Sequence, residues 1–175
     1  MRASPSLRPL KLTPPETSWR KVPTHQGGFI LDGGVHFTAG ARLLLGPSNH
    51  VTRLSAFTRQ NQPHLPPVDT VDATLLTSTG GTGTLSISFG TTMKGSEWTF
   101  GFEKGSVSVS GTTITSTIDG KEEVKEVKDE RSGVPPEVRA WGEALAAGKG
   151  VNERQRPEEA LADLELVSFE TTISF

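Results

Sequence analysis

The sequence predicts an α+β fold, in which an open, mainly antiparallel β-sheet carries helices packed on one face. Three observations lead to this prediction. A segment with helical periodicity comes first, segments that alternate apolar and polar residues fill the middle, and two further helical segments follow. The length of 175 residues suits one domain of ordinary size.

The first helix is expected over residues 32–46. Its apolar residues recur at helical spacing and are followed by a Gly-Pro pair that commonly ends a helix: Val35, Ala39, Leu43, Gly46 and Pro47. Asp32 suits the N-cap position, because its side chain can accept a hydrogen bond from a free backbone amide. Gly33 and Gly34 are poor helix formers, so their presence predicts that another group approaches the backbone closely.

The middle of the chain is expected to form about five or six strands in series. Apolar and polar residues alternate from Val51 to Ile118, and turn signals separate the segments at 80–83, 103–105, 110–111 and 119–120. One face of the resulting sheet is apolar and the other is rich in Ser and Thr, which is typical of an antiparallel sheet with one covered face. The glycine-rich segment 80–83 lies between two strands, so it is interpreted as a hairpin turn and not as a phosphate loop.

The last third of the chain is expected to hold an edge strand or surface segment and two helices. Residues 121–131 mix positive and negative charges. Helices are predicted from Pro135 to Gly148 and from Pro157 onward, each with an apolar stripe. At the other end, residues 1–18 are rich in Pro, Ser and Thr and are interpreted as a flexible leader or linker, with the folded domain spanning 19–175.

Composition excludes several classes of function. The net charge of -2 gives no basic excess for nucleic acid or for an anionic membrane, and the absence of Cys excludes disulfides and thiol chemistry. No apolar run approaches the roughly 20 residues that span a bilayer, and the first residues lack the apolar core of a secretory signal. We therefore expect a cytoplasmic protein. His25, His50 and His64 fall in expected loops without metal-site spacing, so no metal is predicted.

Asp32 and His36 are the candidate catalytic residues. They stand four positions apart, which places both side chains on one face of a helix. A carboxylate beside an imidazole favours the protonated ring and orients it. Interconversion of an alcohol and a ketone needs a general acid–base of this kind. The alternative is structural: Asp32 caps the helix and His36 packs against its neighbours.

Several segments together resemble one known family. They are Ser18-Trp19-Arg20, residues 27–36 (Gly-Gly-Phe-Ile-Leu-Asp-Gly-Gly-Val-His), residues 42–46 (Arg-Leu-Leu-Leu-Gly), Asp69-Thr70-Val71, residues 83–89, residues 103–107, residues 157–161 and Leu164-Glu165. Their types and order resemble the Gfo/Idh/MocA oxidoreductases, the relatives of glucose–fructose oxidoreductase and inositol dehydrogenase. The resemblance runs from about Trp19 to the last residue.

This resemblance implies roles for particular residues. Members have an N-terminal Rossmann domain that binds NAD or NADP, and a C-terminal domain that holds a sugar or polyol substrate and supplies the sheet used for oligomerisation. His36 is implied to be the proton donor–acceptor, and Asp32 its partner or a ligand of the substrate. Arg20 is implied to bind substrate in the same cleft.

The sequence also departs from the family pattern. No Gly-x-Gly-x-x-Gly follows a strand and no Glu-Lys-Pro occurs, so the nucleotide domain and its lysine are not in this chain. We interpret the chain as a fragment, a truncated gene model, or a paralogue without the nucleotide-binding half. The expected function is that of a substrate-binding and oligomerisation domain, which binds no cofactor and is inactive alone. The alternatives are an interaction module that dimerises through its sheet face or joins a full-length relative, and a free-standing carbohydrate-binding domain.

Overall fold

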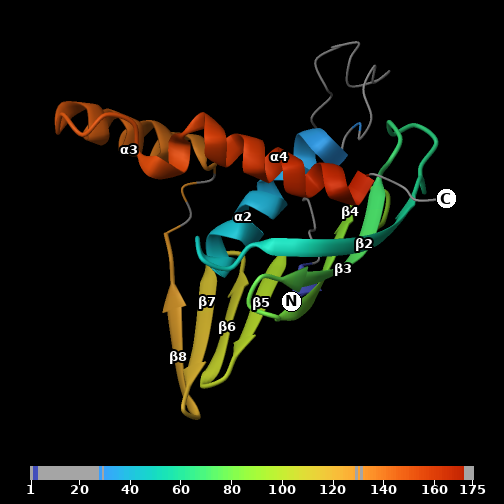
Figure 1. Ribbon diagram of the computed structural model, residues 1–175, viewed down its shortest axis with the longest axis horizontal. Helices are drawn as coiled ribbons and strands as arrows, with labels where there is room; N and C mark the ends of the chain where they lie inside the picture. The colour runs from blue at the N-terminus through green and yellow to red at the C-terminus, as the bar shows by residue number, and fades with distance from the viewer. Residues whose placement is uncertain (1, 4–27, 29, 129, 131, 172–175) are drawn as a thin grey trace.

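The computed structural model describes residues 2–3, 28, 30–128, 130 and 132–171, which form an α+β fold (Figure 1). Its α-helices are α2 (Val35–Leu45), α3 (Val134–Ala146) and α4 (Pro157–Thr171). A π-helical turn, η1 (Ile30–Gly34), runs directly into α2, and a 3-10 turn, η2 (Glu153–Gln155), precedes α4. The helical segments predicted from the sequence are therefore confirmed.

The strands form two antiparallel sheets, where the sequence predicted one. The smaller sheet has the order β2-β3-β4, with β2 (Val51–Arg59), β3 (Thr70–Thr77) and β4 (Thr82–Ser88). The larger has the order β1-β5-β6-β7-β8, with β1 (Arg2–Ala3), β5 (Glu97–Phe102), β6 (Gly105–Ser110), β7 (Thr113–Ile118) and β8 (Lys121–Glu126). Strand β5 of the larger sheet pairs with β1 and β6 and not with β4, so the two sheets are separate in the described residues.

Residues 2 and 3 thus belong to a strand within the segment expected to be a leader. Residues 4–27 lie outside the described residues, so the boundary between 18 and 19 stays a prediction. The predicted hairpin at 80–83 is confirmed, because the Thr77 amide donates to the Gly81 carbonyl across the β3–β4 turn at 2.8 Å.

The core lies between the inner face of the smaller sheet and the helical elements η1 and α4 that pack on it. Seven buried residues form it: Ile30, Val71, Ala73, Leu75, Leu85, Ile87 and Val167. The period of two in β3 and β4 places the apolar residues inside and the polar ones outside. Each large buried side chain contributes about 1.5–3 kcal/mol through its removal from water.

Helices α2 and α4 cross each other over this sheet and are joined by polar contacts (Figure 1). The buried Thr38 hydroxyl donates to the Asp163 carbonyl at 3.3 Å. The Arg42 guanidinium donates to the Asp163 carboxylate, and also to the Glu159 carboxylate at 3.0 Å. Burial of Arg42 opposes its charge, but these hydrogen bonds outweigh burial and raise the pKa of Arg42 above its usual value. Helices α2 and α4, which are far apart in the sequence, are therefore fixed to each other.

Helix α2 also contacts the larger sheet. The rings of Phe37 and Trp98 stack with centroids 6.0 Å apart. A methyl group built on Gly40 would lie 3.3 Å from the Trp98 ring, so the helix backbone and the indole are in close contact. On the opposite edge, β8 is exposed along its whole length and carries Lys and Glu, which discourages pairing with another strand. The mixed-charge segment is thus an edge strand, one of the two forms predicted for it.

Helix α3 contributes no buried residue and projects at one end of the molecule (Figure 1). Its predicted apolar stripe is present but exposed: Val138, Trp141 and Leu145. Helix α3 therefore takes no part in forming the core or in positioning residues 28–36.

Candidate functional site

The junction of η1 and α2 carries both candidate catalytic residues. Asp32 lies in the π turn and is half-buried, whereas His36 lies in the first turn of α2 and is exposed. The N-cap of α2 is Gly34, with no side-chain capping hydrogen bond, so the expected cap at Asp32 is wrong. The reason is that η1 continues directly into α2, and the helix therefore does not begin at a free turn. Single π turns within helices are frequent at functional sites.

Two neighbouring segments approach η1 closely, one at each end. A methyl group built on Gly33 would lie 2.8 Å from Cζ of Phe89, which confirms the close approach predicted from the glycine pair. A methyl group built on Gly28 would collide with the Pro67 carbonyl oxygen. Gly28 also has a φ of 43°, a conformation that favours glycine. The turn that carries Asp32 is therefore bounded on both sides.

The outward face of α2 is open around His36. No hydrogen bond or ion pair joins His36 to any residue that the structure describes, and Asp32 has an interaction of its own. Leu43 lies seven residues after His36, hence on the same side of α2, and its side chain is 62% exposed. An accessible imidazole can exchange a proton with a bound hydroxyl.

The remaining candidate residues are not part of this junction. Arg20 and His25 lie outside the described residues, so their positions stay untested. His50 and His64 are exposed in loops, as expected. The described residues contain no group of three His, Asp or Glu side chains that could hold a metal ion. Within the same residues, no helix is both long and apolar enough to cross a membrane.

A dinucleotide does not fit the elements that the structure describes. Both sheets are antiparallel, whereas a Rossmann site needs parallel strands joined through a helix, with a glycine-rich turn at the helix N-terminus. The glycine-rich segment at residues 80–83 forms the turn of the β3–β4 hairpin. Among the residues that the structure describes, the candidate pair Asp32 and His36 thus lies in a fold without the parallel strand–helix unit of a Rossmann site.

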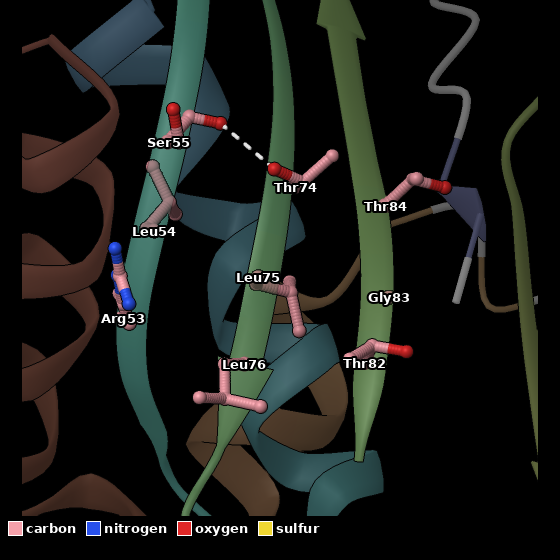
Figure 2. Close-up of a pocket in the computed structure, with 9 residues that line it drawn as sticks. All are labelled: Arg53, Leu54, Ser55, Thr74, Leu75, Leu76, Thr82, Gly83 and Thr84. Atoms are coloured by element: carbon pink, nitrogen blue, oxygen red, sulfur yellow. Dashed lines mark hydrogen bonds between the residues drawn. The ribbon is translucent and has the colours of Figure 1, made fainter. Parts of the chain in front are cut away.

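A hollow of 560 Å³ lies on the smaller sheet, on the face opposite the core (Figure 2). Its walls come from two cross-strand rows of exposed residues: Ser55, Thr74 and Thr84, and Arg53, Leu76 and Thr82. Within this hollow the Thr74 hydroxyl donates to the Ser55 carbonyl at 3.4 Å. The sheet separates this hollow from Asp32 and His36.

Sequence reasoning missed one buried residue near the junction, Asp69. Its side chain is completely buried, and its carboxylate accepts hydrogen bonds from the loop that joins β2 to β3. The signal available in the sequence was an aspartate between a Pro-rich loop and a strand, a position that favours capping of loop amides.

Comparison with known proteins agrees with this geometry. A family model described as "Oxidoreductase family, C-terminal alpha/beta domain" matches residues 7–167. The chain belongs to the Gfo/Idh/MocA oxidoreductases. Dehydrogenase FPY6 of Fusarium mangiferae is 36% identical over 158 residues, which cover 87% of this chain and 45% of that protein. The family predicted from the residues is thus confirmed.

Solved structures share the fold. An oxidoreductase from Thermotoga maritima is 28% identical, with a TM-score of 0.76 over 98% of this chain and 50% of that one. The WlbA dehydrogenase from Bordetella pertussis, in complex with NADH and UDP-GlcNAcA, is 21% identical with a TM-score of 0.69, over 97% of this chain and 49% of that one. The chain therefore spans about half the length of the relatives it matches.

Proposed function

We propose that this chain is the substrate-binding half of an NAD(P)-dependent oxidoreductase that acts on a sugar, a polyol or a related hydroxy compound. The observation that carries the proposal is the η1–α2 junction, where Asp32 and His36 lie in successive turns of one continuous helical segment. His36 accepts the proton of the substrate hydroxyl, and Asp32 orients the ring or the substrate. The Bordetella relative, whose structure holds NADH and a sugar nucleotide, supports this substrate class.

The cofactor belongs to a separate nucleotide-binding domain in this proposal. This chain matches about half the length of its relatives, and the other half of each relative is long enough to form such a domain. The exposed His36 on the open face of α2 leaves this side of the helix accessible to such a domain. Hydride transfer requires the nicotinamide to be held against the substrate, so this half alone is inactive.

The test joins the chain to a nucleotide-binding half. Residues 1–175 are placed behind the first half of the Fusarium dehydrogenase, replacing the part that this chain matches. The isolated chain is expected to leave NADH fluorescence unchanged, whereas the fusion is expected to bind NADH and to reduce NAD(P) with sugars or polyols. Turnover by the isolated chain would contradict the proposal, as would a folded, NADH-binding fusion that oxidises no hydroxy compound.

A second candidate function is dimerisation through the outer face of the smaller sheet. Phe57 lies on this face and is 86% exposed, and it is next to the hollow of Ser, Thr and Leu residues. Large exposed aromatic side chains are typical of protein interfaces. The same face would form the subunit contact in an oligomeric oxidoreductase and equally in a non-catalytic interaction module.

Phe57→Arg tests this interface. The wild-type chain is expected to have the mass of a dimer by light scattering, and the variant that of a monomer, because a charge at the centre of the contact is left without a partner. Leu43→Arg, on the other side of the molecule, is the control and should leave the dimer intact. A monomeric wild-type chain would contradict the second function and leave the first unaffected.

A further inference from the structure

Asp69 is a buried charged residue with no role in the proton transfer described above. Its carboxylate accepts hydrogen bonds from the Asn61 amide at 2.9 and 3.0 Å, the Gln62 amide at 2.8 Å and the Thr70 hydroxyl at 2.9 Å. A buried carboxylate is tolerated only when such bonds replace its water. Asp69 therefore closes the loop between β2 and β3 onto the start of β3.

This loop connects Asp69 to one end of the catalytic turn. The Gln60 side chain donates to the Leu65 carbonyl at 2.9 Å, and the Leu65 amide donates to the Gln62 carbonyl at 3.1 Å. Pro66 follows and is buried, with its Cβ 3.3 Å from a methyl group built on Gly28. Hydrogen bonds and packing thus run without a break from the Asp69 carboxylate to Gly28, two residues before η1 begins.

A second connection reaches the other end of the turn. The Phe89 amide donates to the Asp69 carbonyl at 2.8 Å, and the Phe89 ring lies against Gly33. The next residue, Gly90, is buried and has no room for a side chain, because a methyl group there would lie 2.5 Å from both Asp69 carboxylate oxygens. The Gln62 side chain donates to the Gly90 carbonyl at 3.0 Å, which joins the two connections.

We propose that Asp69 is a positioning residue for the catalytic turn: it anchors the contacts at Gly28 and Gly33, between which Asp32 is held, and so sets where Asp32 and His36 point. The roles of Asp32 and His36 rest on the proposed function, whereas the position of the turn does not. Asp69 itself touches neither substrate nor cofactor.

Four variants separate positioning from general stability. Asp69→Ala removes both acceptor oxygens. Asp69→Asn keeps one oxygen for the amides of Asn61 and Gln62, and its NH₂ group can donate to the Thr70 hydroxyl, which can also accept. Gly90→Ala displaces the carboxylate without removing it. Asp72→Ala is the matched control, because Asp72 is the next aspartate along the chain but lies within β3, exposed on the outer face.

The experiment measures amide hydrogen exchange and the His36 ring signal by NMR on the full chain, with the ring signal assigned through His36→Gln. In Asp69→Ala and Gly90→Ala, exchange at residues 30–34 should accelerate by about tenfold or more, and the His36 signal should shift. Strands β6 and β7, in the other sheet, serve as the reference and should stay protected. Asp69→Asn and Asp72→Ala should match the wild type at residues 30–34 and at His36.

Faster exchange confined to the loop at residues 60–62, with residues 30–34 and the His36 signal unchanged, would overturn the proposal. An Asp69→Asn variant as perturbed as Asp69→Ala would also overturn it, because the charge and not the hydrogen-bonded anchor would then be responsible. If Asp69→Ala does not fold, Gly90→Ala decides by the same two readouts. The NMR experiment uses neither substrate nor cofactor. A negative result therefore tests the positioning role of Asp69 and can be distinguished from a fusion that shows no oxidoreductase activity.

Discussion

His36→Gln is expected to lower kcat of the fused oxidoreductase by about 10²–10⁴-fold, the usual contribution of a positioned general acid–base. His36 is exposed and has no hydrogen-bond partner among the residues that the structure describes, so its replacement should remove the proposed proton acceptor without disturbing the fold. Steady-state rates with a polyol or sugar and NAD(P), measured on the fusion to a nucleotide-binding half, check this result.

His50→Gln provides the matched control. His50 is also exposed, but it lies in the loop between α2 and β2. Its replacement should leave kcat within about twofold, because a solvated loop side chain contributes little. Equal rates for wild type and His36→Gln, with NADH still bound, would show that another group moves the proton. His36 would then have only a structural role.

Ile87→Ala is expected to lower the free energy of unfolding by about 2–5 kcal/mol, the range for a large aliphatic residue lost from a packed core. Ile87 is completely buried on β4, and its Cδ1 would lie 3.7 Å from a methyl group built on Gly34. The truncation leaves a cavity where the sheet meets the end of η1. Urea unfolding of the two proteins, followed by circular dichroism, measures the difference.

Phe57→Ala is the control for this loss. It removes a larger side chain from the same sheet, but Phe57 is 86% exposed on the outer face. The expected loss for a monomer is no more than about 0.5 kcal/mol. Comparable losses for the two variants would mean that the outer face is as buried as the core, for example in a stable dimer.

The sequence predicts the elements well because local signals coincide with the fold. In β3, the alternation of Val71, Ala73 and Leu75 with polar residues matches the buried and exposed faces residue by residue. Gly46, with a φ of 81°, follows the last residue of α2 as its stop signal indicates. Asp119 and Gly120 both have positive φ, as a tight hairpin requires. Each of these features depends on a few adjacent residues.

Features that depend on distant contacts could not be read from the sequence. The division into two sheets depends on which strands pair over long distances, such as Ala3 with Trp98, and no local pattern reveals this. The π turn replaces the expected cap at Asp32 because η1 is enclosed by neighbours from elsewhere in the chain, among them Phe89. The burial of Asp69 likewise depends on backbone amides of the β2–β3 loop, such as that of Gln62, which donate to its carboxylate.

The contact between Thr38 and Asp163 has a consequence for protein synthesis. These residues are 125 positions apart, and α4 supplies Val167 to the same core as Ile30. A ribosome that has made only the residues up to the last strand therefore holds a chain whose inner sheet face lacks the part of its cover that α4 supplies. The β5–β8 meander, built from neighbouring hairpins, can form early, whereas the smaller sheet must wait for α4 to emerge. During that interval the nascent chain is a natural client for chaperones that shield apolar surface.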